Sequence, residues 1–405
     1  MDQSLQDELD RYGFSQVVVI HRHVAVLSAP EPPLSNIDSH FLPAPIAPGT
    51  FSARSLPHGA EAPAVFHYPR LGCSLGYADR DGVTALRAHP EVEAVYAAQA
   101  AGIVRPVRMA AVSLRQKLTW AIRTLRVDRL WAQGLTGKSV RVGHLDTGVD
   151  ANHPALKGRV AGFAEWDLLG RRMESADPHD TDYHGTHTAA TLGGRSVGGR
   201  SVGLAPECVL YSGLVIEGGS ALARVLGGME WMLETGVKVL NMSLGWRGYN
   251  PTFLTVTIRL RQQGVLPVFA IGNEGSGTSR SPGNYPETLS VGAVDRSRRV
   301  PLFSSSIHFN RDRDPDQPDL VAPGVSIISA RAGGGYMSMD GTSMATPHVA
   351  AVAALLWQAK PDATVDQIEL AIRQTCRKLP DEDPLRYGNG QIDPLAALAA
   401  LTGGI

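Results

Sequence analysis

Apolar strands alternate with helices along the chain from Trp120 onward. Four short apolar runs, each bounded by glycine, proline or polar residues, predict β-strands at 139–145, 237–244, 265–271 and 288–294. The segments 221–235 and 251–263 between them have the apolar spacing of helices. Strands that alternate with helices predict a mostly parallel sheet with helices on both faces, and an active crevice at the carboxyl ends of its strands.

The clearest helical pattern follows residue 343. Apolar residues recur there at i, i+3, i+4 and i+7, which predicts one stripe facing a core: Val349, Val352, Ala353 and Leu356. Pro347 falls near the expected first turn, where a missing N–H costs little. We therefore expect Ser343 just at the start of this helix, at the positive end of its dipole, where negative charge on a reacting oxygen is favoured.

The first hundred residues have a different pattern. They predict a strand at 16–23, a strand pair at 66–77, a short helix at 81–89 and a last strand at 92–98, with a proline-rich stretch at 30–63. This order predicts a small α+β domain ahead of the α/β domain. We place the division between 98 and 118, which gives domains of 1–115 and 116–405.

Composition narrows the classes of function. A chain of 405 residues is long enough for two domains of roughly 100 to 200 residues. Its 38 basic and 39 acidic side chains nearly cancel, so charge does not indicate a nucleic acid or an anionic membrane as partner, and we expect a peptidic one. The three cysteines, Cys73, Cys208 and Cys376, are far apart, which argues against a disulfide framework.

The sequence contains no recognisable targeting segment. The first residues are acidic where a secretory signal is basic, and no apolar run reaches the roughly 18 residues of a membrane helix. These features predict no membrane association, and a protein that is cytoplasmic or exported without a recognisable signal peptide.

Three residues supply the groups that a serine nucleophile needs. A serine hydroxyl is a weak nucleophile, so an imidazole must accept its proton and a carboxylate must orient that imidazole. Ser343, His184 and Asp146 are of these three types. The side-chain amide of Asn273, together with the backbone N–H of Ser343, could stabilise the oxyanion that forms.

Five motifs carry a resemblance to a known family. In order they are VRVGHLDTGVDANHP, HGTHTAATLGG, LNMSLG, AIGNEG and DGTSMATPHVAAVAALL, and over residues 120–400 they resemble the subtilisin family, the subtilases. The resemblance implies that Asp146 orients His184 as general base, that Ser343 is the nucleophile and that Asn273 is the oxyanion donor. It also implies a substrate-binding wall formed by Ser243, Leu244 and Gly245, against which an extended substrate pairs as an added strand. Glu274 would lie near the specificity pocket.

The resemblance predicts a serine endopeptidase that forms an acyl-enzyme and cleaves itself. GYADRDGVTALRAHPEVEAVY resembles the family's propeptide, which implies that the N-terminal domain is a chaperone and inhibitor of its own enzyme. A separate binding module remains the alternative for that domain. Two alternatives remain for the whole chain: acyl transfer to an amine by the same triad, and an inactive scaffold that acts through the N-terminal domain.

Simpler interpretations exist for several residues. DTG at Asp146 also marks aspartic proteases, but no second DTG or DSG is present. His179, His184 and His187 could form a zinc site, although HExxH is missing. Asn273 alone could hold a left-handed turn, His144 is most simply a satisfied core histidine, and His348 packs. Arg280 could attract an acidic substrate side chain or be a solvated surface arginine.

No cofactor is expected. The family's tight calcium site uses an acid shortly after the catalytic aspartate and an Asn-rich loop after the histidine helix. Ala155 and the loop GGRSVGGRSVG at 193–203 stand at these positions, and neither offers the oxygen ligands that calcium requires. We expect that site to be lost, and this expectation concerns that site alone.

Overall fold

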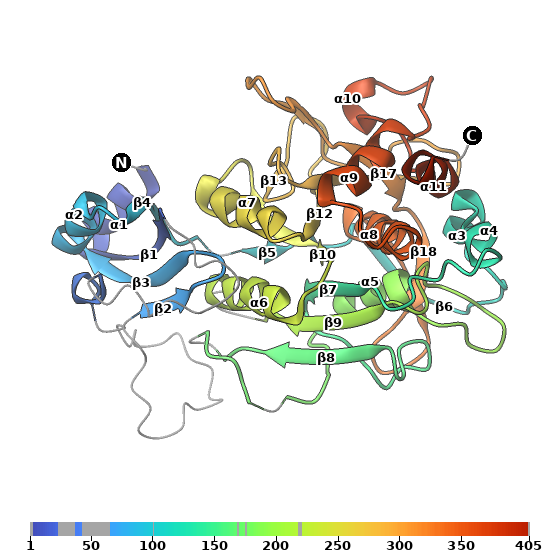
Figure 1. The fold of residues 1–405 in the computed structure, drawn as a ribbon, viewed down its shortest axis with the longest axis horizontal. Helices are drawn as coiled ribbons and strands as arrows, with labels where there is room; N and C mark the ends of the chain where they lie inside the picture. The colour runs from blue at the N-terminus through green and yellow to red at the C-terminus, as the bar shows by residue number, and fades with distance from the viewer. Residues whose placement is uncertain are drawn as a thin grey trace.

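The computed structural model describes residues 3–22, 37–42, 65–99, 101–167, 170–174, 176–217 and 221–403. Its main element is a seven-stranded sheet in the order β17-β14-β12-β10-β7-β9-β8, in which all neighbouring strands are parallel (Figure 1). The strands are β7 Arg141–Asp146, β8 Val160–Glu165, β9 Val209–Leu214, β10 Val239–Met242, β12 Leu266–Ala270, β14 Leu289–Val294 and β17 Leu320–Pro323. The predicted α/β class with a mostly parallel sheet is confirmed.

Helices cover both faces of this sheet, because alternate residues of its strands point to opposite sides. Val239 belongs to the core beneath α5 and α8, and its neighbour Leu240 belongs to the core beneath α6 and α7. The helices of this part of the chain are α3 Trp120–Leu125, α4 Val127–Trp131, α5 His184–Gly193, α6 Leu222–Thr235, α7 Leu254–Gln262, α8 Thr342–Ala359, α9 Val365–Gln374, α10 Pro384–Tyr387 and α11 Pro394–Thr402.

Two details of the predicted elements are corrected. The run 237–244 is not one strand, since β10 ends at Met242 and the chain continues into β11 Leu244–Arg247, which belongs to another sheet. Helix α8 is also buried around its whole circumference from Thr342 to Trp357, because it lies against the sheet, α5, α9 and α11. The predicted single apolar stripe therefore covers only part of the helix surface that is buried. Ser343 is the second residue of α8.

Smaller strands complete the part of the chain after residue 100. Two three-stranded sheets are ordered β13-β11-β5 and β18-β19-β6, and along the chain β11 follows the end of β10 and β18 follows the end of β17. Their bounds, with those of a two-stranded sheet, are β5 Gly102–Ile103, β6 Arg108–Val112, β13 Arg280–Ser281, β15 Ile307–His308, β16 Asp316–Gln317, β18 Ile327–Ala330 and β19 Tyr336–Asp340.

The N-terminal residues form their own four-stranded antiparallel sheet, ordered β2-β3-β1-β4. The elements are α1 Gln3–Tyr12, β1 Phe14–His21, β2 Val65–Tyr68, β3 Cys73–Asp79, α2 Arg80–Ala88 and β4 Val92–Ala97. The expected strands and short helix are present, and Asp79 caps the start of α2, where its side chain accepts from the Gly82 N–H at 2.8 Å. Most of the proline-rich stretch 30–63 lies outside the described residues.

Both faces of this small sheet are covered, which explains its continuous apolar run VVVI. Val17 and Val19 pack beneath α1 and α2, whereas Val18 and Ile20 join the core that contains α6 and α7. In Figure 1 the N-terminal unit accordingly lies against the α6 and α7 side of the main sheet.

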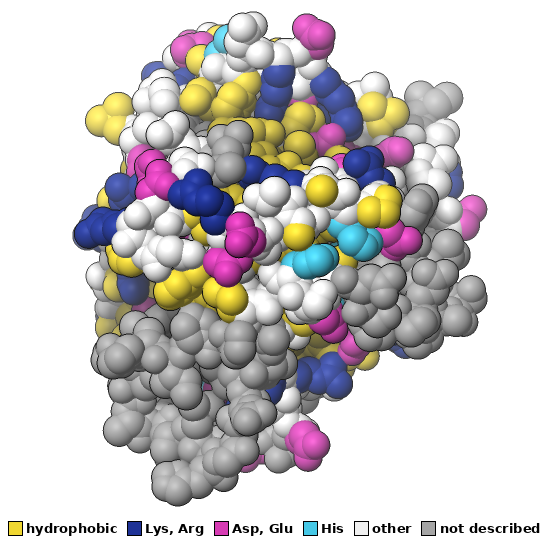
Figure 2. Space-filling model, turned by 90° about the vertical axis from the view of Figure 1, so that its left-hand side faces the viewer, with side chains coloured by type: hydrophobic (Ala, Val, Ile, Leu, Met, Phe, Trp, Pro, Cys, Tyr) yellow, Lys and Arg dark blue, Asp and Glu magenta, His cyan; other side chains and the backbone are white. Residues whose placement is uncertain are grey.

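The outer surface of this unit carries charges of both signs. Figure 2, which looks onto the N-terminal side, shows acidic and basic side chains interspersed over this face.

No helix in the described part of the chain is long and apolar enough to cross a membrane. The cysteines Cys73, Cys208 and Cys376 are free thiols.

Candidate active site

Asp146 and His184 meet at the carboxyl edge of the main sheet. Asp146 is the last residue of β7 and His184 is the first residue of α5. The His184 Nδ1 atom lies 2.7 Å from Asp146 Oδ1, and the Thr147 N–H donates to the same oxygen at 2.8 Å. Both side chains are buried, so this contact is shielded from solvent.

The two groups shift each other's pKa in opposite directions. Burial lowers the pKa of His184, but the charge and hydrogen bond of Asp146, with the charges of Asp180 and Asp182, outweigh it, and the net pKa is raised above 6.5. Burial raises the pKa of Asp146, yet His184 and the other donors bring it below its usual 3.8. The pair therefore favours an ionised carboxylate beside an imidazole that readily accepts a proton.

Ser343 lies in the first turn of α8, and its hydroxyl faces the chain's own backbone. Ser343 Oγ donates to the Val104 carbonyl oxygen at 2.6 Å. His184 Nε2 is buried and has no hydrogen-bond partner within the described ranges. The structure thus joins Asp146 to His184, while the expected hydrogen bond from Ser343 to His184 is replaced by one to Val104.

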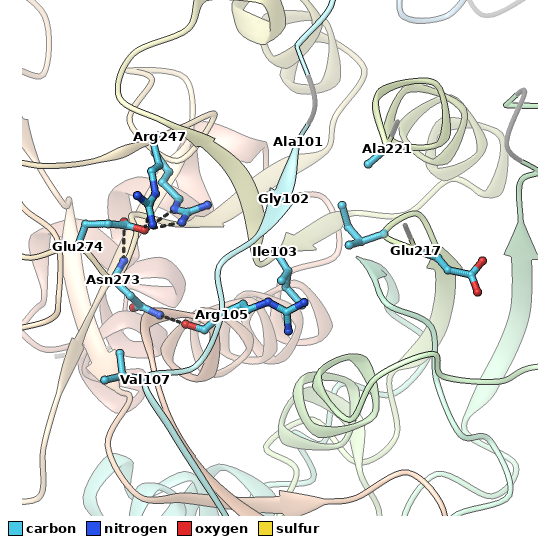
Figure 3. A pocket seen from close by; sticks show the side chains of 12 residues that line it. Ala101, Gly102, Ile103, Arg105, Val107, Glu217, Ala221, Arg247, Asn273 and Glu274 are labelled. Atoms are coloured by element: carbon cyan, nitrogen blue, oxygen red, sulfur yellow. Dashed lines mark hydrogen bonds and ion pairs between the residues drawn. The ribbon is translucent and has the colours of Figure 1, made fainter. Parts of the chain in front are cut away.

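Asn273 follows β12 and turns its amide group toward the same segment. Its Oδ1 accepts from the N–H and the hydroxyl of Thr342, each at 2.9 Å, which leaves Nδ2 to donate to the Arg105 carbonyl at 2.8 Å (Figure 3). The left-handed turn considered for this asparagine is wrong. Asn273 is not among the described residues with positive φ, and its neighbour Gly272 has a φ of 123°.

The segment that meets Ser343 and Asn273 lies in the cleft as an extended strand. Gly102 pairs with Gly245 and Ile103 with Leu244, and the Val104 N–H donates to Ser243 O at 2.9 Å. On the other side of Val104, β6 pairs with β19. The wall 243–245 therefore pairs with an added antiparallel strand, and that strand is 102–104 of the same chain.

Comparisons with known proteins identify the family of this chain. The model of the subtilase family matches residues 137–390, which is more than half of the chain. This chain belongs to the subtilase family. It is 30% identical to the thermostable alkaline protease of Halalkalibacterium halodurans over 93% of this chain and 96% of that protein. It is 35% identical to subtilisin E of Bacillus subtilis and 34% identical to the subtilisin of Bacillus pumilus, each over 70% of this chain and over 71% and 99% of the relative.

This subtilase is a serine endopeptidase, and its cleft contains a polar pocket of about 510 Å³ beside Asn273. Glu274 Oε1 accepts from Arg280 Nε at 3.0 Å, and Arg247 approaches the same carboxylate at 3.6 Å (Figure 3). Burial raises the pKa of Glu274, but Arg280 outweighs it and the net pKa is lowered. Arg280 is only 9% exposed, so its interpretation as a solvated surface arginine is wrong.

The remaining polar residues near Asp146 and His184 have structural partners. Asp180 accepts from the Thr186 N–H at 2.7 Å and from Thr147 Oγ1 at 2.7 Å, at the start of α5. His187 Nε2 lies 3.0 Å from Ile327 O, and His348 Nδ1 lies 2.8 Å from Met344 O. Within the described ranges no group of three or more His, Cys, Asp or Glu side chains is placed to hold a metal ion.

Sequence patterns did not reveal every residue that shapes this site. Val104 belongs to no motif, and its contact with Ser343 depends on how the N-terminal unit packs. Thr188 is within the histidine motif, yet only the fold brings its hydroxyl to 3.3 Å from Asp146 Oδ2. The spacing of four residues from His184 on α5 is the one signal that could have pointed to it.

Proposed function

We propose that this subtilase hydrolyses peptide bonds through an acyl-enzyme, with Ser343 as nucleophile, His184 as general base and Asp146 as the group that orients His184. Three observations support this proposal: the Ser343 hydroxyl donates to a peptide carbonyl, His184 lies 2.7 Å from Asp146, and α8, which carries Ser343, packs against α5, which begins at His184. Once the cleft is free, the Ser343 hydroxyl can turn to His184 Nε2, which then accepts its proton during attack. The proton later passes to the leaving amine.

Asn273 and the wall 243–245 complete this proposal. The Asn273 Nδ2 group donates into the cleft, and Ser343 N–H lies in the first turn of α8, where no intrahelical acceptor exists. Together they would stabilise the oxyanion. Ser243, Leu244 and Gly245 would hold the substrate as an antiparallel strand, as they hold 102–104.

We infer that the first substrate is the chain itself, at the Val104–Arg105 bond. Ser343 Oγ contacts the carbonyl of this bond at 2.6 Å, and strand pairing on both sides keeps the bond extended across the cleft. The bond lies within the window 98–118 expected from the sequence. Until the cleaved N-terminal unit leaves, the segment ending at Val104 would block the cleft.

The N-terminal residues are proposed to act as this enzyme's inhibitor, with expected domains of 1–115 and 116–405. After cleavage at Val104–Arg105, residues 105–115 would stay with the second domain, where β6 pairs with β19. The Bacillus pumilus subtilisin is matched over 99% of its length by only 70% of this chain, which supports a separable N-terminal part. Glu230 on α6 accepts from the Arg70 and Leu71 N–H groups at 3.0 Å each. The compartment of the protein stays a prediction: cytoplasm, or export without a recognisable signal peptide.

Active-site labelling tests the proposed function. The protein is incubated with a fluorophosphonate probe and the labelled peptide is identified by mass spectrometry. Labelling at Ser343 supports the proposal, whereas labelling elsewhere or none contradicts it. The mass of the products from a peptide substrate then separates hydrolysis, which adds one water, from transfer to an amine.

We predict that the pocket next to Asn273 accepts short side chains. In the strand pairing Gly102 shares a face with Gly245, and alternation puts the Val104 side chain on that face too. A Cβ built on Gly245 would lie 2.2 Å from the Ser281 carbonyl oxygen and 3.6 Å from the Arg280 Cβ, so the backbone of Ser281 and the side chain of Arg280 border this space. The Arg280 side chain makes this space short. Its charge, which is paired with Glu274, makes the space unfavourable for a large apolar ring. Peptides cut after Val or Ala should have kcat/KM at least about tenfold above peptides cut after Phe.

The double variant Arg280→Gly, Glu274→Gln should reverse this preference, because it empties the pocket without leaving a buried unpaired carboxylate. Arg247→Ala is the matched control, since Arg247 reaches the same carboxylate from a largely exposed position. Equal cleavage after Phe and Val by the wild type would contradict the prediction.

Arg259 is predicted to retain the cleaved N-terminal unit. This buried α7 side chain donates to the Leu71 carbonyl at 2.7 Å and also to the carbonyls of Gly72 and His21. Arg259→Ala leaves these carbonyls without a charged donor, so the cleaved unit should dissociate at least about tenfold faster. The measurement is the rate at which peptidase activity appears after self-cleavage.

Arg261→Ala provides the control for that measurement. Arg261 lies on the same helix but pairs with Asp366 and Glu369. An equal acceleration in both variants would mean that general loosening of α7, rather than the contact with the N-terminal unit, controls release.

We propose that the family's calcium site is absent from this chain. Ala155 has no side-chain oxygen, and its carbonyl accepts from the Arg195 N–H at 2.8 Å. The Arg195 guanidinium donates to the Pro154 carbonyl at 3.1 Å, which brings a positive side chain to the position where a cation would need oxygen ligands. These residues do not fit calcium.

A further inference from the structure

The two oxygens of the Asp146 carboxylate have unequal partners. Oδ1 lies 2.7 Å from His184 Nδ1 and accepts from the Thr147 N–H at 2.8 Å. Oδ2 has the Thr188 hydroxyl at 3.3 Å, and His144 Nε2 lies 3.7 Å away. Asp146 is 2% exposed, so Oδ2 depends on these protein groups for its stabilisation.

Thr188 has one proton and several possible acceptors. Its Oγ1 lies 3.1 Å from the carbonyls of His184 and Gly185, and 2.8 Å from His144 Nε2. If Nε2 lacked a proton, it would be the nearest acceptor for the threonine, and Asp146 Oδ2 would lose its donor. A proton on Nε2 instead makes the imidazole donate to Thr188, and the threonine proton is then available to Asp146 Oδ2, whose negative charge makes it a stronger acceptor than the two carbonyls.

The other nitrogen of His144 is consistent with this direction. His144 Nδ1 lies 3.0 Å from the Ser212 hydroxyl on β9, which can donate to it. The ring is fully buried, and burial lowers its pKa to about 4, so it is neutral at neutral pH. The charged groups that face it are Asp146 on its own strand and His184 on α5.

We propose that His144 is a positioning residue of the triad: by donating from Nε2 to Thr188, it directs the threonine proton onto Asp146 Oδ2 and so sets how strongly Asp146 holds a proton on His184. The donor chain runs from Ser212 to His144, and from His144 through Thr188 to Asp146. This inference rests on the proposed function, since it concerns the same triad. It replaces the interpretation of His144 as a core histidine without function.

The effect on catalysis has a defined sign. A carboxylate that loses a donor on one oxygen becomes more basic and holds an imidazolium on the other oxygen more strongly. The pKa of His184 should then rise further. Because His184 must be neutral to act as base, activity is lost as pH falls through that pKa, and the acid limb should move to higher pH.

The test measures kcat, KM and the acid limb of kcat/KM for Thr188→Val, His144→Val and His144→Gln on one peptide substrate. Thr188→Val keeps the shape of the side chain and removes only the hydroxyl. Thr188→Val and His144→Val should shift the acid limb upward by about half a unit to one unit and lower kcat about five- to tenfold. KM should not change, because these buried residues do not line the cleft. His144→Gln, which can still donate an N–H, should restore most of the wild-type kcat and most of the wild-type position of the acid limb.

Fluorophosphonate labelling of Ser343 in each variant, with its melting temperature, verifies that the site is folded. Folded Thr188→Val with an unchanged acid limb and kcat would overturn the inference, as would His144→Gln that behaves like His144→Val. Failure of the proposed function is distinct from either result, because the wild type would then neither hydrolyse the peptide nor label at Ser343.

Discussion

The wild-type chain is expected to yield a new N-terminus at Arg105, whereas Ser343→Ala stays at full length. The expectation follows from the 2.6 Å contact between the Ser343 hydroxyl and the Val104 carbonyl in a strand held on both sides. Alanine removes the nucleophile and keeps the packing. In subtilisin, a relative, the corresponding loss is about 10⁶-fold in kcat, and a loss of this size would leave no detectable cleavage. Intact mass and N-terminal sequencing after refolding measure the outcome.

Two results would contradict this prediction in different ways. Cleavage of the Ser343→Ala chain at Val104–Arg105 would mean that another group or another protease cuts the bond. Cleavage of the wild type elsewhere between 98 and 118 would preserve self-processing but would contradict the assigned bond. Adding active wild-type enzyme to Ser343→Ala in excess distinguishes cleavage within one molecule from cleavage between molecules.

Asn273→Ala is expected to lower kcat by about 10²- to 10³-fold with little change in KM, a range established in subtilisin itself. The amide Nδ2 is already fixed in the cleft, because Thr342 holds the other end of the amide with two hydrogen bonds of 2.9 Å. Such a preorganised donor contributes most when the carbonyl oxygen becomes charged, so its loss appears in kcat. Steady-state kinetics on a peptide cut after Val measures both constants.

Thr342→Val is the matched control for Asn273. It removes one of the two hydrogen bonds that orient the amide and retains the amide itself, so kcat should fall by less than about tenfold. A loss in Asn273→Ala that appears only in KM would mean that Asn273 binds the ground state, and its role as oxyanion donor would be wrong.

The sequence was sufficient where one local pattern determined one element. The runs 139–145, 265–271 and 288–294 became β7, β12 and β14, since strands buried on both faces must be continuously apolar. It was insufficient for β8 at the sheet edge, whose residues are mostly half-buried and small, and for β17, a strand of four residues that ends in proline. Short strands are too weakly patterned for periodicity to separate them from loops.

For the candidate site, the sequence by itself determined the chemistry: which aspartate, histidine, serine and asparagine are available, and in which order they follow one another along the chain. Only the tertiary structure decided that Val104 lies against Ser343, that Arg280 is buried beside Glu274, and that His144 reaches Asp146 through Thr188. Motifs record neighbours along the chain, whereas these contacts join residues from separate elements. Their geometry arises when helices and the N-terminal sheet pack on the main sheet, and no periodicity along the chain encodes it.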